Sequence, residues 1–393
     1  MANVNAALVQ KQVFDEGVQD ELRDYTYARE FADVRTEAGE FIYKRKGSDP
    51  IADMTTDGTL VVQDFTYDKD SIGLAKQAYK VERITLMDAT RQGFLLKEDR
   101  MSRYAETIGR KINRDTILTS FNSAGLTVTD GDLPTASNGG ATNPILVNST
   151  SADDLSVTVT QKLQENNALD QMPYMIMRPK DAARFGLFAM GTGATAIANL
   201  NLNGGYQRMT NIFGFDIFVT NDVPYSATIT LGAVGTAADT LTIKGVVWTL
   251  RAAAAVTGEI TIGGTSALTA QNIVNAINGS GTGFVEVSSA NRYIIKGANI
   301  SATLVGSVIT VTSNVTMANA KVSTAITLGT ETACIIAGAR KSTVLRLPDG
   351  GYSSQVLTEI PLFTGTEVRA TQIFDNGVWS KTAPKIVKVP VVL

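Results

Sequence analysis

One stretch of the chain is typical of a single long helix, and it constrains the fold more than any other feature. Residues 99–121 read DRMSRYAETIGRKINRDTILTSF. Met101, Ala105, Ile108 and Ile112 recur at the spacing of one helix face. At about 1.5 Å per residue such a helix is roughly 35 Å long. We expect this helix to be a structural spine whose apolar stripe packs on the body of the protein.

The charges of the same stretch are arranged to support an exposed helix face. Three pairs of opposite charge stand four residues apart: Asp99–Arg103, Glu106–Arg110 and Lys111–Asp115. Each such pair stabilises a helix by about 0.2–0.5 kcal/mol. Ile117, Leu118 and Phe121 depart from the apolar stripe, so we expect the last turns to be covered on more than one side.

The composition argues against catalysis. The 393 residues include no histidine and one cysteine, Cys334, so His-dependent triads, His-ligated metals and zinc sites of Cys and His are excluded. The nearest approaches to phosphate loops, Gly191–Gly193 and Gly263–Gly264, lack the following Lys-Ser/Thr and are interpreted as turns. We expect no enzyme activity, no cofactor and no metal.

Charge and hydropathy also limit the partners. The net charge of −3 and the pI of about 5.3 argue against a dedicated nucleic-acid binder. Residues 1–20 lack a basic start followed by an apolar core, and nowhere do about 18 apolar residues run together, so we expect no secretory signal and no membrane association. The single cysteine fits a reducing cytoplasm or a particle assembled there.

The N-terminal part is expected to begin with an amphipathic helix. Residues 13–34 place Phe14, Val18, Leu22 and Phe31 at spacings near 3.6. This helix either covers the core of its own chain or forms an arm against a neighbouring subunit, and the sequence leaves both alternatives open.

Residues 41–87 are expected to form a long two-stranded β excursion. FIYKRKG and LVVQDFTYD are rich in β-branched and aromatic residues, and turn formers separate them. The following LAKQAYKVERITLMD alternates polar and apolar residues, with Tyr79, Val81, Ile84 and Leu86 among the apolar ones. Because an isolated hairpin is marginally stable in water, we expect another molecule to supply its third strand or its cover.

After the long helix the sequence predicts a mixed body. A turn-rich loop over 125–150 precedes a helix over 151–166, a buried strand over 174–177, a short helix from Asp181 and a strand within 214–224. Strand-like segments from Ala333 onward are expected to complete this body.

Between these parts lies a segment of different composition. Residues 226–330 hold eight of the 73 charged residues of the chain, and no proline stands between Pro224 and Pro348. We expect a separate, mostly β domain with one embedded helix, TAQNIVNAING, which ends at Gly279. FVEVSS and RYIIKG, after this helix, are predicted to be strands.

Taken in order, these segments resemble the major capsid protein of tailed bacteriophages, the Hong Kong 97 fold. RYAETIGRKINRDTIL is similar to the spine-helix pattern, and VERITLMDATRQGF to the exit from the extended loop. MIMRPKDAARF and GFDIFVTNDVP resemble the pieces that lead into the axial domain. The resemblance covers about residues 10–225 and 331–393.

The resemblance implies an α+β capsid fold with an inserted, mostly β domain. The expected parts are an N-terminal arm (1–40), an extended loop (41–87), a peripheral domain with the spine helix and the start of the axial domain (88–225), the insertion (226–330) and the remainder of the axial and peripheral domains (331–393).

The resemblance also implies a structural function. The chain would assemble with itself into hexamers and pentamers of an icosahedral shell around double-stranded DNA, which it would contact non-specifically. A portal, a separate scaffolding protein and a decoration protein are the further partners implied. The location would be the virion, assembled in the host cytoplasm.

Contacts between subunits are expected on the arm, the extended loop and the spine helix. The candidate residues are Phe14, Leu22, Lys44, Arg45, Lys46, Asp64, Arg100, Arg103, Glu106 and Arg110. Both groups of charges also have an interpretation that needs no contact between subunits. The basic run 44–46 is then a solvated strand end, and the helix charges form ion pairs within the helix.

Three alternatives remain open. An encapsulin-type compartment shell shares the fold but encloses protein cargo. A tail-tube or surface-layer component would fit the Thr- and Ala-rich segment. An enzyme that uses only carboxylates, such as a glycosidase, is disfavoured because no convincing carboxylate pair is found.

Overall fold

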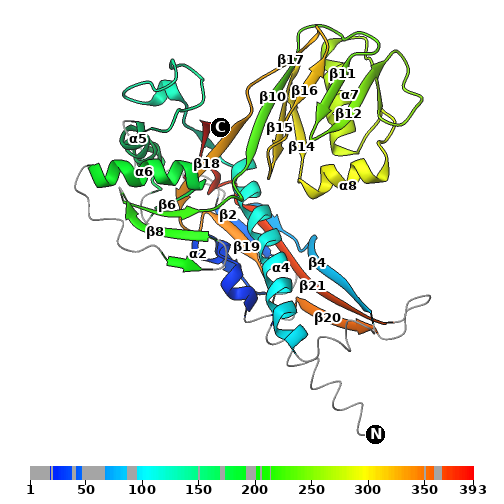
Figure 1. Cartoon of the computed structure of the whole chain (residues 1–393). Coiled ribbons are helices and arrows are strands. Elements are labelled where there is room, and N and C mark those ends of the chain that lie inside the picture. Colours follow the sequence, from blue (N-terminus) through cyan, green and yellow to red (C-terminus); the bar gives the residue numbers. More distant parts are fainter. Residues whose placement is uncertain are drawn as a thin grey trace, which may run out of the picture. The chain divides into compact units, whose positions relative to one another are not determined.

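The computed structural model of the chain divides into two compact units. One comprises Met1–Thr116 and Lys341–Ala383, and the other Ile117–Arg340 and Pro384–Leu393. The structure describes residues 18, 21–37, 41–46, 67–85, 95–148, 151–168, 173–191, 201–203, 206–212, 214–348, 351–357 and 365–393. Both units combine helices with sheets, so the predicted α+β class is confirmed (Figure 1).

The sheet of the first unit is organised around one long strand, β21 (Gly365–Val378). It pairs antiparallel with β19, β20 and β4, and β1 pairs parallel with β19. Figure 1 shows β4, β21 and β20 side by side. The partner strands are β1 (Asp33–Arg35), β4 (Lys76–Thr85), β19 (Thr343–Arg346) and β20 (Tyr352–Leu357).

The excursion differs from the expectation in one strand. β2 (Phe41–Lys46) and β3 (Tyr67–Ile72) form an antiparallel pair. β4, which we expected to belong with them, instead pairs with β21 along its whole length, from Lys76 opposite Phe374 to Thr85 opposite Gly365. The chain thus supplies this strand's partner itself, from a segment nearly 300 residues further along.

The predicted long helix is confirmed as α4 (Leu95–Asn122), and it begins four residues earlier than expected. Ala105, Ile108 and Ile112 of the predicted stripe are buried, as are Tyr104 beside them and Ile117 in the last turns. Two predicted ion pairs form, Arg110–Glu106 at 3.0 Å and Lys111–Asp115 at 2.9 Å. The helix is therefore buried along one face in its earlier turns and on more than one side toward its end.

The N-terminal helical segment packs on α4 of the same chain. Residues 21–25 are helical, and α2 (Ala28–Phe31) follows them. The Asn113 side chain accepts a hydrogen bond from Ala28 N (3.1 Å) and donates one to Tyr25 O (2.8 Å). Gly109 permits this approach, because a Cβ there would lie 2.9 Å from Tyr25 Cβ. For these residues the first alternative holds: they cover the core of their own chain.

The second unit is built on a large mixed sheet in which β18 (Thr332–Ala339) is central. The strands follow the order β14-β15-β10-β18-β6-β9-β8-β7, and β22 pairs with both β18 and β5. Outside the insertion the strands are β5 (Leu126–Thr127), β6 (Pro173–Met177), β7 (Asn201–Asn203), β8 (Tyr206–Ile212), β9 (Phe215–Val219) and β22 (Ile386–Val392).

Two helices of this unit accompany the sheet, α5 (Ser151–Glu165) and α6 (Pro179–Gly191). Leu155, Val159 and Leu163 of α5 are buried, which confirms the predicted face. α6 begins at Pro179 rather than at Asp181, because proline fits the first helical position, where its missing N–H is not needed.

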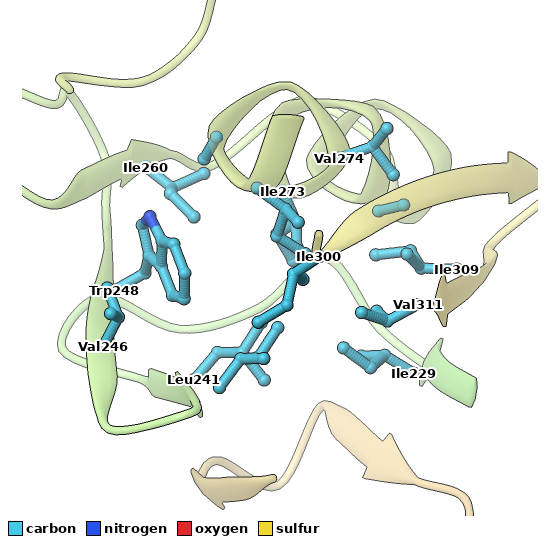
Figure 2. Packing of buried hydrophobic residues seen from close by; sticks show 14 of the residues in the cluster. Ile229, Leu241, Val246, Trp248, Ile260, Ile273, Val274, Ile300, Ile309 and Val311 are labelled. Carbon is cyan, nitrogen blue, oxygen red and sulfur yellow. The ribbon is translucent and has the colours of Figure 1, made fainter. Parts of the chain in front are cut away.

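Residues 225–328 form their own hydrophobic core between two sheets and a helix. Figure 2 shows Trp248, Ile260 and Ile273 pointing into this core. A four-stranded sheet has the order β13-β12-β11-β16, and β14, β15, β10 and β17 belong to the larger sheet. The strands are β10 (Tyr225–Leu231), β11 (Thr240–Ile243), β12 (Val246–Arg251), β13 (Glu259–Thr261), β14 (Ser301–Val305), β15 (Val308–Ser313), β16 (Ala320–Val322) and β17 (Ile326–Leu328).

The predicted helix of this segment is confirmed as α7 (Ser266–Asn278). The Thr265 side chain caps its N-terminus, and Gly279 follows it in the left-handed conformation. The prediction of a strand at RYIIKG is wrong: these residues lie in helix α8 (Ser289–Gly297), and FVEVSS contributes only an isolated bridge at Phe284.

Local and tertiary contacts explain the change at α8. The Ser288 side chain accepts a hydrogen bond from Asn291 N and caps the helix. The guanidinium of Arg292 donates to the carbonyls of Ala276 and Ile277 at the end of α7. A β-branched composition predicted a strand, but this cap and this contact with α7 favour the helix.

Candidate functional site

Reactive groups in the described residues serve the fold. Cys334 is fully buried in β18, and burial raises the pKa of its thiol to about 12, so the thiolate is not formed near neutral pH. Among the described residues, no three His, Cys, Asp or Glu side chains gather as a metal site would require. None of the helices in that part of the chain has the length and apolarity of a membrane span.

Asp130 is buried at the centre of the turn-rich loop after α4. Its carboxylate accepts hydrogen bonds from Ser137 N, Ser137 Oγ, Asn138 N and Gly140 N, at 2.6–2.7 Å. Burial raises the pKa of Asp130, but these hydrogen bonds outweigh burial, so its pKa lies below the ordinary value. The carboxylate holds the loop in one conformation.

The candidate residues on α4 lie on its outer side. Arg103 is exposed, and Glu106 and Arg110 form the ion pair described above with both side chains partly exposed. Arg100 belongs to the first turns of the helix, where the structure describes the backbone only. This face is charged, and internal pairing balances part of its charge.

The candidate residues of the extended loop lie on β2. The register places Lys44 opposite Lys69, Arg45 opposite Asp68 and Lys46 opposite Tyr67. Asp64 and Phe14 lie outside the described residues.

Leu22 is buried within its own chain. It lies in the helical segment 21–25 at 5% exposure, and its role as a contact residue stays a prediction. The burial results from the close packing of this segment on α4.

Sequence reasoning missed an uncovered apolar side of β4. Tyr79 is 69% exposed and Val81 43% exposed, whereas Ala78, the residue before Tyr79, is buried. Side chains alternate along a strand, so Tyr79 and Val81 share the outward face and Ala78 faces the core. The alternation was visible in the sequence, but it did not say which side of the strand would be covered. Exposed apolar patches of this kind mark surfaces that meet other molecules.

A polar cluster lies where β4 begins. Lys76 Nζ donates to Asn376 Oδ1 (2.5 Å), and Ala75 N donates to Asp375 Oδ2 (3.1 Å). Burial lowers the pKa of Lys76, while Asp115 and Asp375 act in the opposite direction. The cluster joins β4, β21 and α4 within the first unit.

The insertion also carries exposed apolar side chains. Tyr293 of α8 is 78% exposed, and Val305 and Val322 at strand ends are similarly open. They lie on different elements, in contrast to the pair on β4, so they do not by themselves define a surface.

No known family profile matches the chain, and no curated protein matches it by sequence. Similar solved structures include the capsid of the cyanophage P-SCSP1u, with 9% identity and a TM-score of 0.47 over 92% of this chain and 86% of the other. A virus-like particle from Pyrococcus furiosus has 10% identity and a TM-score of 0.43 over 96% and 97%. The holo-SrpI encapsulin complex from Synechococcus elongatus has 10% identity and a TM-score of 0.43 over 93% and 87%. With TM-scores below 0.5, these likenesses decide neither fold nor function, and both are inferred from the chain's own elements.

Proposed function

We propose that this chain is a structural capsid protein of the Hong Kong 97-like type, the major shell subunit of a tailed bacteriophage. The observation that carries the proposal is the order of elements along the chain. A β hairpin precedes a 28-residue helix, and a mixed unit with an insertion follows. The C-terminal segment then returns strands to both units.

The exposed side of β4 supports an assembling function. Tyr79 and Val81 are two exposed apolar side chains on the same side of β4, and exposed apolar side chains that lie together mark surfaces that meet other molecules. A neighbouring copy that covers this face would remove the exposed apolar area from water. The same neighbour would give the β2–β3 hairpin the further strand or cover that a two-stranded pair needs.

In this proposal the chain assembles with itself into hexamers and pentamers of an icosahedral shell in the host cytoplasm and remains in the virion. The shell encloses double-stranded DNA. The proposed contact with DNA is non-specific, because the net charge of −3 argues against a dedicated nucleic-acid binder. A portal, a separate scaffolding protein and a decoration protein are its further proposed partners.

The proposal retains the domain boundaries inferred from the sequence. They are an arm over 1–40, an extended loop over 41–87, the peripheral domain and start of the axial domain over 88–225, the insertion over 226–330 and the remainder over 331–393. The separate core of residues 225–328 supports the insertion as a distinct domain.

Electron microscopy and nuclease-protected nucleic-acid content of the purified particles test the proposal. Closed polyhedra that protect double-stranded DNA are expected from infected or reconstituted material. Closed shells filled with a cargo protein and free of DNA would favour an encapsulin-type compartment instead. Tubes or flat lattices would overturn the capsid assignment.

A further inference from the structure

One buried arginine joins both legs of the β excursion at the point where they leave the body. Arg346, the last residue of β19, is 0% exposed. Its Nη1 donates to the carbonyls of Ile72 (2.7 Å) and Gly73 (3.1 Å), and its Nη2 donates to the carbonyl of Glu37 (2.9 Å). Glu37 lies shortly before β2, Ile72 is the last residue of β3 and Gly73 follows it, so one guanidinium spans the neck of the excursion.

The strand that carries Arg346 is fixed on both sides. β19 pairs with β1 through Arg35 opposite Arg346, and with β21 through Arg346 opposite Asp375. Leu347 N also donates to Arg35 O at 2.8 Å. The backbone of Arg346 is therefore held in the sheet, and its guanidinium fixes the segment before β2 and the end of β3 relative to that sheet.

Apolar packing supports the same neck. Ile72 clusters with the buried Val344 and Trp379. Gly377 faces Ile72, and a Cβ at Gly377 would lie 2.7 Å from Ile72 Cδ1. The end of β3 is therefore held by packing as well as by Arg346, and the segment before β2 is held by the hydrogen bond from Arg346 to the carbonyl of Glu37.

The chemistry of the contact requires an arginine. A guanidinium is planar, permanently charged and has donors on both terminal nitrogens, so it can bind carbonyls of two separate segments at once. Lysine places its charge on a single nitrogen, which cannot span the same two legs in this fixed geometry. A buried cation is costly to desolvate, and this cost offsets part of what its hydrogen bonds contribute to stability. Such a residue fits a role in fixing geometry rather than in adding stability.

We infer that Arg346 is a positioning residue that clamps the neck of the excursion and sets the direction in which the β2–β3 hairpin leaves the body. The inference rests on the proposed function, because a fixed direction matters when the hairpin must reach a second copy of the chain. Folding of the monomer does not require it.

Two variants of the full chain test the clamp, Arg346→Met and Arg346→Lys. Amide hydrogen exchange of β2 and β3 is expected to quicken by about tenfold or more in both, because the charge-assisted hydrogen bonds at the neck are lost. Exchange in α5 and α7 is expected to stay unchanged. Assembly into closed particles is expected to fall strongly at concentrations where the unaltered chain assembles.

Ile108→Ala is the matched control, since it removes buried apolar volume from α4 in the same unit without touching the neck. It should lower thermal stability, as the loss of buried apolar volume does, but leave β2–β3 exchange and assembly at low temperature as they were. Unchanged β2–β3 exchange in Arg346→Lys, or normal assembly of both arginine variants, would overturn the inference.

The two proposals fail in distinguishable ways. If the unaltered chain forms no closed shell, the proposed function fails, while the exchange difference still decides whether Arg346 clamps the neck. If Arg346→Met does not fold, Arg346→Lys alone tests the clamp. If neither variant folds, the inference that the monomer folds without Arg346 is contradicted.

Discussion

At the scale of single residues, several positions matter because of what approaches them rather than because of their own chemistry. Gly109 lies on α4, where alanine would ordinarily be favoured over glycine by up to about 1 kcal/mol. Here the backbone and Cβ of Tyr25 occupy the space that a methyl group would need. The contact between the N-terminal segment and α4 therefore reverses the usual preference.

We expect Gly109→Ala to lower the free energy of unfolding by about 1–3 kcal/mol, as overpacking does. Thr107→Ala, on the exposed side of the same helix, is the control and should be neutral or slightly stabilising. Chemical denaturation of both variants measures the difference. Stabilisation by Gly109→Ala would contradict the close approach of Tyr25.

Asp130 gives a prediction with a defined dependence on pH. Its pKa is depressed in the folded chain, so its stabilising contribution is present above its unfolded value and is lost as pH falls through the folded value. Asp130→Asn should lower the free energy of unfolding by about 1–3 kcal/mol near pH 7, because an amide nitrogen cannot accept the hydrogen bonds that the carboxylate accepts.

The difference in unfolding free energy between the unaltered chain and Asp130→Asn should shrink as the pH falls below about 4. There the Asp130 carboxylate of the unfolded chain begins to protonate, while that of the folded chain protonates only at lower pH. Denaturation curves over a series of pH values provide the measurement. A difference that stays constant into the acid range would show that the carboxylate charge is not what holds the loop.

At the scale of elements, the outcome depended on how local the stabilising contacts are. α4, α5 and α7 were predicted from the sequence because the period of their apolar residues and their caps lie within each segment. α8 was wrongly predicted to be a strand. The contact of Arg292 with the end of α7, which favours the helix, joins residues 15 or 16 positions apart in the chain. Segment composition does not contain that contact.

β4 supplies the prediction at this scale. Tyr79→Ser combined with Val81→Thr should change monomer stability by no more than about 0.5 kcal/mol, since both side chains are exposed. The same pair of changes should raise the protein concentration needed for assembly, because the apolar face of β4 loses the area that a neighbour would cover. Light scattering during assembly measures this.

Tyr293→Ser is the matched control for β4, because Tyr293 is an equally exposed tyrosine on α8 of the insertion. It is expected to leave assembly unchanged. If the control and the β4 variant impaired assembly equally, the β4 face would not be the specific contact.

At the scale of the whole molecule, the insertion has a core of its own but shares a sheet with the body. Its buried cluster lies between Ala227 and Ile326, yet β10 also pairs with β18 at Tyr225 and Ser226. The apolar core favours an autonomous domain, and the shared strand ties its two ends to the second unit.

We expect a fragment of residues 225–330 to fold alone with a cooperative thermal transition. Ile273→Ala in this fragment should destabilise it by about 2–5 kcal/mol, because Ile273 is fully buried in the core of α7 and the two sheets. Differential scanning calorimetry with amide spectra measures both. A disordered fragment would contradict the proposed domain boundary.

The candidate surface could be predicted only in part. The sequence indicated α4, the basic run on β2 and the alternation of β4. It left open whether Leu22 is buried in its own chain, and it did not indicate that Tyr79 and Val81 face outward or that Arg346 spans the neck of the excursion. Each of these depends on a partner distant in the chain, such as Ile72, which lies 274 positions from Arg346.

The sequence by itself determined the long helix, the low-charge insertion with its capped helix and the absence of histidine chemistry, because period, composition and caps act within short segments. The tertiary structure decided the pairing of β4 with β21, the helical state of α8 and the residues that hold the excursion. These features arise where backbone groups far apart in the chain must satisfy one another's hydrogen bonds, and no local pattern specifies which distant segment will do so.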